Sequence, residues 1–114
     1  MTRSPSALTL QRLRDRGYMA DIAERWIPGA NIRKDLFGFG DIVAIGHGYV
    51  ILVQATSIAN IAARRTKIEG IEHAAPILRN GVHVEVWGWG KGKEPRLSRE
   101  RAMEMEGTIS WLKL

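Results

Sequence analysis

The sequence predicts an α/β fold in which helices flank a mixed β-sheet, with the elements in the order α-β-β-β-α-β. Residues 42–45 and 49–53 are apolar runs rich in β-branched side chains, as in a hairpin that is buried within a sheet. Apolar residues at helical spacing follow, and residues 82–87 then alternate in polarity like a strand. The 114 residues suit a single domain, residues 1–114, with one core.

The first part of the chain predicts a helix and then a strand. Ser4 and Pro5 are typical of a helix start, three leucines follow, and Gly17 is typical of a stop. Residues 18–26 alternate in polarity and predict a half-buried strand. The Pro-Gly pair at residues 28–29 is expected to end it.

The central part predicts the hairpin and two helical pieces. Residues 46–48, Gly-His-Gly, are expected to turn the chain between the two apolar strands. Ser57 can cap a helix that extends to Ile68. Residues 71–78 predict a second helical piece, opened or interrupted at Pro76.

The last third predicts a strand, a loop and a strand-like end. After the strand at residues 82–87, residues 88–95 predict a flexible basic loop, and residues 103–114 are most like a strand. Trp87 and Trp89 could stack on a base, but packing in the core or at a dimer interface is the favoured interpretation.

The composition limits the possible functions. Seventeen basic and twelve acidic residues give a formal net charge of +5, which attracts polyanions such as nucleic acid; a merely soluble basic protein is the alternative. The absence of cysteine excludes disulfides, thiolate metal sites and cysteine nucleophiles. Without an export signal or an apolar run of about 20 residues, a cytoplasmic, intracellular location is expected.

Oxygen-bearing side chains mark one end of the predicted hairpin. Asp41 opens its first strand and Gln54 ends its second, so a tight turn would bring them side by side. Such oxygens are ligands that Mg²⁺ prefers. Asp35, which precedes Asp41 across a glycine-rich turn, is a third candidate. The alternative is structural: Asp41 caps a turn, Gln54 bonds to backbone, and Phe37 fills the core.

Basic residues form two clusters that are candidates for phosphate contact. One lies near the end of the first predicted helix after the hairpin. The other surrounds the glycine-rich loop and consists of Lys91, Lys93, Arg96, Arg99 and Arg101. Phosphate binding would explain both basic clusters, because contacts to the DNA backbone are electrostatic and independent of sequence. A solvated charged face would explain either cluster taken alone. The candidate DNA-binding residues are Lys34, Arg64, Arg65, Lys67, Lys91 and Lys93. The three histidines lack metal-ligand spacing.

Residues 7–90 resemble the PD-(D/E)XK nuclease superfamily, in particular Holliday-junction-resolvase-like proteins of archaea and phages. The resemblance rests on GFGDIVAI, VILVQATS, ARRTKI and HVEVWGW, and it implies a restriction-endonuclease-like core. In that family an Asp opens the second core strand and a Glu-x-Lys triplet ends the third. By position Asp41 matches the Asp, Gln54 the Glu, and Thr56 the Lys.

Two departures from the family motif change the expected site. Gln54 can ligate through its carbonyl oxygen but brings no charge, and Thr56 cannot act as a lysine. The first predicted helix also lacks the family's Glu. Asp35 or Glu24 could compensate for the missing acid, and Lys67, Lys34 or Arg64 for the missing lysine.

The resemblance therefore implies a metal-dependent endonuclease that cuts branched or otherwise structured DNA as a homodimer. Mg²⁺ or Mn²⁺ would be held by Asp41, Gln54 and Asp35, with Lys67 completing the catalytic set. The alternative from another class is a DNA-binding module on a nuclease fold whose chemistry has decayed. A pure protein-interaction domain would leave the basic clusters without a role.

Overall fold

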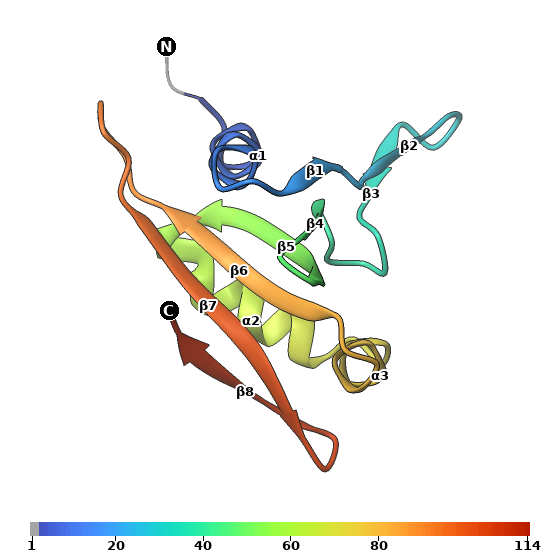
Figure 1. The fold of residues 1–114 in the computed structure, drawn as a ribbon. Coiled ribbons are helices and arrows are strands. Elements are labelled where there is room, and N and C mark those ends of the chain that lie inside the picture. The colour runs from blue at the N-terminus through green and yellow to red at the C-terminus, as the bar shows by residue number, and fades with distance from the viewer. Residues whose placement is uncertain (1–2) are drawn as a thin grey trace.

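A six-stranded mixed sheet forms the centre of the structure, a computed structural model that describes residues 3–114 (Figure 1). The strand order is β1-β4-β5-β6-β7-β8; β5 and β6 are parallel and every other neighbouring pair is antiparallel. The strands of this sheet are β1 (Met19–Ile22), β4 (Ile42–Gly46), β5 (Tyr49–Ser57), β6 (His83–Trp89), β7 (Leu97–Met105) and β8 (Thr108–Lys113).

Helices cover both faces of this sheet, so the predicted α/β class with a mixed sheet is confirmed (Figure 1). The helical elements are α1 (Pro5–Asp15), the 3₁₀ turn η1 (Ile58–Asn60), α2 (Ile61–Glu69) and α3 (Ala74–Arg79). A separate two-stranded sheet pairs β2 (Arg25–Ile27) with β3 (Ile32–Lys34). Within residues 3–114, no helix is long and apolar enough to cross a membrane.

The predicted hairpin is confirmed as β4 and β5. His47 and Gly48 both adopt positive φ, 54° and 90°, as a two-residue turn between twisted strands requires. The His47 ring also bonds to the carbonyl oxygen of Arg16 at 2.8 Å. Because β6 is parallel to β5, the chain must cross over between them, and η1, α2 and α3 form that crossover.

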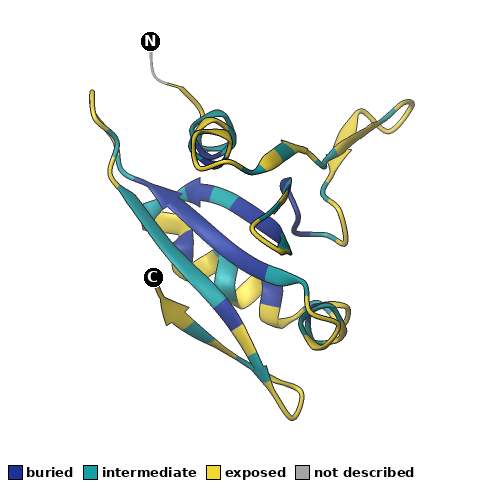
Figure 2. Cartoon of the chain, viewed as in Figure 1, coloured by how far each residue is buried: buried dark blue, intermediate teal, exposed yellow. Residues whose placement is uncertain are grey.

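The core has one layer on each face of the sheet, and Figure 2 shows β6 buried along most of its length. On the α1 face, Leu13, Trp87 and Trp89 pack with β4 and β5, and Trp89 Nε1 donates a hydrogen bond to Thr9 Oγ1 at 2.8 Å. These two tryptophans are therefore core residues. On the other face, a Cβ at residue 88 would lie 2.4 Å from Cδ1 of Ile61. Glycine is therefore needed at this position for α2 to pack this closely on β6.

The prediction of a single half-buried strand over residues 18–26 is wrong. The strand β1 ends at Ile22, and β2 begins at Arg25 in a different sheet. The alternation was misleading because Trp26 is 54% exposed on a hairpin that stands away from the core. The Pro-Gly pair at residues 28–29 lies in the turn of that hairpin.

Three other boundaries also differ from the prediction. Ser57 precedes η1 and makes no side-chain capping bond, and α2 begins only at Ile61. The strand at residues 82–87 extends to Trp89, which shortens the basic loop. β7 begins at Leu97, so Arg99 and Arg101 lie on a strand instead of beside a loop.

Candidate metal centre

Asp41 lies where three neighbouring segments of the sheet meet. Its backbone N–H donates to the carbonyl of Val53 on β5 at 2.9 Å, and its own carbonyl accepts from Ala23 N, just beyond β1, at 2.8 Å. These two bonds fix the start of β4 between β5 and the residue before Glu24. The predicted hairpin therefore places Asp41 beside Gln54, and a longer-range contact adds Glu24.

Three carboxylates converge at this point. Glu24, Asp35 and Asp41 each contribute one oxygen atom, and these atoms lie within 4.8 Å of one another. Asp41 is only 8% exposed, and the other two are half-buried. Carboxylates held this closely repel one another unless a proton or a cation is present, and carboxylate oxygens are the preferred ligands of Mg²⁺.

Gln54 supplies a further oxygen that fits a cation. Its Nε2 donates to Asp41 Oδ2 at 2.8 Å, and Ala55 N donates to the same oxygen at 2.9 Å. The Gln54 side chain is 3% exposed, yet its Oε1 finds no hydrogen-bond partner among residues 3–114. A buried carbonyl without a partner is costly, and coordination of a cation would satisfy it. The donor set therefore fits a hard divalent ion.

The electrostatics of Asp41 support the same interpretation. Its pKa is raised to about 7, chiefly by burial and further by the neighbouring Asp35, while the bonds from Ala55 and Gln54 act in the opposite direction. Near neutral pH the protein alone therefore holds Asp41 partly protonated. A divalent cation would favour the ionised carboxylate and lower this pKa.

Basic side chains surround the acids. Lys67 on α2 places Nζ 3.7 Å from Asp35 Oδ2, and Arg33 on β3 pairs with Glu24 at 3.0 Å. Lys34 and Arg25 line a cavity of about 410 Å³ together with Asp35. The structure thus brings together all four predicted catalytic residues, Asp41, Gln54, Asp35 and Lys67. It also includes Glu24, which the sequence offered as an alternative to Asp35, and adds Arg25 and Arg33.

The position that matches the family's lysine offers no charge. Thr56 is 5% exposed and lies on the same face of β5 as Gln54, two residues further along the strand. Its hydroxyl cannot replace an ammonium group. Lys67 is the lysine that the structure places in contact with the acid cluster.

The other predicted DNA-binding residues differ in their surroundings. Arg65 pairs with Glu100 at 2.6 Å, and the half-buried Arg64 lies beside it on α2. Figure 1 shows the β6–β7 connection, which contains the exposed Lys91 and Lys93, on the opposite side of the view from the β2–β3 hairpin. The two lysines are therefore not part of the acid cluster.

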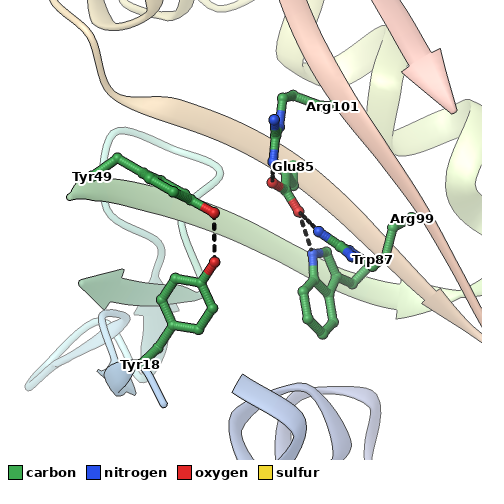
Figure 3. A network of polar contacts seen from close by, with 6 residues as sticks. All are labelled: Tyr18, Tyr49, Glu85, Trp87, Arg99 and Arg101. Carbon is green, nitrogen blue, oxygen red and sulfur yellow. Dashed lines mark hydrogen bonds and ion pairs between the residues drawn. The ribbon is translucent and has the colours of Figure 1, made fainter. Parts of the chain in front are cut away.

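A buried ion cluster explains two arginines that the sequence placed near a phosphate-binding loop. Glu85 on β6 is fully buried and accepts hydrogen bonds from Arg99 at 3.1 Å, from Arg101 at 2.8 and 3.0 Å, and from Trp87 Nε1 at 2.8 Å (Figure 3). Burial raises the pKa of Glu85, but the Trp87 bond and the two arginines outweigh this and lower it overall. Arg99 and Arg101 therefore neutralise Glu85.

A second polar contact lies close to this cluster in Figure 3. The hydroxyl groups of Tyr18 and Tyr49 are 2.5 Å apart. Burial and the bond to Tyr49 raise the pKa of Tyr18 to about 12, so the Tyr18 hydroxyl is neutral at physiological pH. This contact ties the connection between α1 and β1 to β5 and is structural.

Glu24 is the acid that local sequence patterns could not place in the site. Its neighbour Ala23 reaches Asp41 through a backbone bond between segments 18 residues apart in sequence (41 − 23). The only local signal was an acid at the edge of an alternating segment, which is common on exposed strands. Comparison of the chain with protein-family models, with curated proteins and with solved structures finds no match.

Proposed function

We propose that the protein is a metal-dependent endodeoxyribonuclease that hydrolyses phosphodiester bonds in branched or structured DNA. The main observation in support is the convergence of Glu24, Asp35 and Asp41 beside the unpartnered carbonyl oxygen of Gln54. The resemblance to PD-(D/E)XK nucleases agrees with the position of Asp41 at the start of β4 and Gln54 on β5. On this proposal, α1, β1, β4, β5, α2 and β6 form a restriction-endonuclease-like core.

The proposed ligands of Mg²⁺ or Mn²⁺ are Asp41, Asp35, Glu24 and the Gln54 carbonyl oxygen. When bound, the ion polarises the phosphate and supplies hydroxide near neutral pH. Gln54 also orients Asp41 through the bond from its Nε2. Lys67 compensates the negative charge of Asp35, and its ammonium group can stabilise charge on the phosphate in the transition state.

The basic residues beside the cluster give the DNA backbone a path to it. Arg25 and Lys34 line the cavity that contains Asp35, where they can bind phosphates on either side of the scissile bond. Arg64 and Arg65 on α2 are further candidates for phosphate contact, although Arg65 already pairs with Glu100. Lys91 and Lys93 would contact phosphates further away and contribute to affinity without taking part in cleavage.

The alternative proposal is a DNA-binding module whose chemistry has decayed. The neutral Gln54 and the buried Thr56 support it, because each takes the place of a charged residue in the family motif. Cleavage assays on junction, flap, duplex and single-stranded DNA, with Mg²⁺, Mn²⁺ or EDTA, separate the two proposals. The nuclease proposal expects cleavage of branched DNA that EDTA abolishes, and binding without cleavage would favour the decayed module.

Salt dependence and two lysine variants sharpen this test. If six or more phosphates are contacted, affinity should fall by about 10³-fold or more between ~50 and ~200 mM salt. Lys67→Ala should reduce cleavage more than binding, whereas the matched double variant Lys91→Ala/Lys93→Ala should weaken binding and leave the cleavage rate of bound DNA unchanged. Failure to bind any DNA at low salt contradicts both proposals.

A two-fold homodimer is part of the proposal, because two symmetric nicks in a four-way junction need two sites. Trp87 and Trp89 do not support it, since they are buried in the core. Its support is the β7–β8 hairpin, because β8 is an edge strand of the sheet and an open edge favours pairing with a second copy. On this hairpin, Met103 and Met105 of β7 and Leu112 of β8 are 47%, 77% and 50% exposed. Light scattering that finds only monomer, with and without junction DNA, would contradict the dimer.

A further inference from the structure

The turn between Asp35 and Asp41 exposes an aromatic side chain beside the acid cluster. Phe37 is 49% exposed, whereas Phe39, two residues later, is fully buried in the core. The expectation that Phe37 fills the core is therefore wrong, because Phe39 does so. The Phe37 ring packs against His73, with 5.9 Å between the ring centroids, but about half of the side chain is left open to solvent.

The backbone at this position also disfavours phenylalanine. Phe37 has φ of 55° and Gly38 has φ of 86°, and the turn is closed by bonds from Phe39 N and Gly40 N to the carbonyl of Leu36 at 3.2 and 2.8 Å. Two successive residues at positive φ favour Asn-Gly or Gly-Gly, and a bulky residue is strained there. Partial packing against His73 leaves about half of the ring exposed, and the backbone conformation disfavours phenylalanine, so a role outside the fold is indicated.

The surroundings of Phe37 identify the kind of ligand. Its ring lines the charged cavity that contains Arg25, Lys34 and Asp35. It also lines an adjoining apolar groove of about 420 Å³, with Val43, Pro76 and Ile77 among its walls. One face of this region therefore suits an anion and the other suits a flat apolar group. A nucleotide contains both, a phosphate joined to a base.

We propose that Phe37 stacks on a base that has left the helical stack next to the scissile phosphate. In continuous duplex DNA the base faces are covered by their neighbours, so only a branch point, a flap or a single-stranded segment presents one at low cost. Phe37 thus selects branched or unpaired DNA, while Arg25 and Lys34 bind the adjoining phosphates. This inference rests on the proposed nuclease function and names the structural feature of the substrate that the site recognises.

The test compares two substitutions at residue 37. Phe37→Asn removes the aromatic face but suits positive φ, so its melting temperature should equal or exceed that of the unmodified protein. Phe37→Tyr retains the ring. Ile45→Ala is the matched control, because Ile45 is a similarly exposed apolar residue, 44%, on β4, and it does not line the acid cavity.

The measurements are junction and duplex affinity, cleavage, and the fluorescence of 2-aminopurine at the branch point. The unmodified protein, Phe37→Tyr and Ile45→Ala should bind the junction alike and change the 2-aminopurine signal alike. Phe37→Asn should bind the junction about 5- to 100-fold more weakly, the range expected from loss of one base–aromatic stack. Its affinity for continuous duplex should be unchanged.

Three contrary outcomes are distinguishable. If Phe37→Asn binds and cuts the junction like the unmodified protein and changes the 2-aminopurine signal equally, the role of Phe37 is refuted and the nuclease proposal stands. If the unmodified protein neither binds nor cuts any of these DNAs, the proposed function fails and this inference fails with it. An equal loss of affinity for duplex and junction would show that Phe37 does not discriminate between them.

Discussion

Replacing Asp41 with asparagine is expected to abolish metal-dependent cleavage while leaving the protein folded and able to bind DNA. Asparagine keeps the size of the side chain and an oxygen that can accept the bonds from Gln54 and Ala55. It removes the most buried anionic ligand of the cluster. Metal ions contribute several kcal/mol of transition-state stabilisation, so cleavage should fall by at least about 10³-fold.

The stability of this variant should depend on pH in a specific direction. Because the pKa of Asp41 is raised to about 7 in the folded protein, folding favours the protonated form. That contribution is complete below the unfolded pKa of about 3.9 and is lost as pH rises through about 7. The asparagine side chain imitates the neutral acid at every pH, so in EDTA at pH 8 the variant Asp41→Asn should melt at a higher temperature than the unmodified protein.

Divalent cations should reverse this order. Mg²⁺ or Mn²⁺ should raise the melting temperature of the unmodified protein at pH 8 and have little effect on Asp41→Asn, because ligand binding stabilises only the form that binds. Calorimetric melts with Mg²⁺ and with EDTA check both statements. Cleavage by Asp41→Asn at the unmodified rate, in a preparation free of contaminating nuclease, would be incompatible with the proposed metal centre.

Gln54 allows the opposite change. Asp41→Asn replaces a carboxylate with an amide, whereas Gln54→Glu replaces an amide with a carboxylate. Gln54→Glu restores the acid of the family motif and adds a charged ligand, so metal affinity should increase and cleavage should persist or rise. In EDTA the same variant should be less stable, since another carboxylate joins the cluster. Gln54→Ala should lose activity. If Gln54→Glu also fails to cut, the decayed DNA-binding module becomes the better proposal.

Residues close in sequence account for the part of the site that could be predicted. The runs that form β4 and β5 are apolar and β-branched, and one short turn joins them. A hairpin of that length fixes which residues face one another, so Asp41 beside Gln54 follows from the pattern. The contact of Lys67 with Asp35 joins residues 32 apart in sequence (67 − 35), and the sequence alone did not separate Lys67 from Lys34 and Arg64.

The rest depends on contacts that no local pattern contains. Glu24 reaches the cluster only because the backbone of Ala23 bonds to that of Asp41 at the start of the neighbouring strand. The exposed β2–β3 hairpin has the same alternation of polar and apolar residues as a half-buried strand, so the pattern could not distinguish the two. Phe37 and Phe39 have nearly the same local sequence, and only the closed turn decides which ring enters the core.

Glu85 provides the largest expected effect on stability. Glu85→Gln keeps the shape of the side chain but leaves the charges of Arg99 and Arg101, whose side chains are 22% and 25% exposed, without a counter-ion at the centre of the sheet. Breaking a buried ion pair from one side costs roughly 3–5 kcal/mol. Urea unfolding should show this loss. The control Asp21→Asn removes one partner of the solvent-exposed Arg14–Asp21 pair and should cost little.

Glu85→Gln should also change how the free energy of unfolding depends on pH in the acid range. The pKa of Glu85 is lowered in the folded protein, so its contribution is complete above the unfolded pKa of about 4.3 and is lost as pH falls through the lower folded value. Glu85→Gln should therefore differ most from the unmodified protein at neutral pH, and the difference should shrink in acid. A constant difference between pH 7 and pH 3 would show that changed hydrogen bonds, and not charge, are responsible. In that case Arg99 and Arg101 would not be bound electrostatically to Glu85, and they would return to the set of side chains available to DNA phosphates.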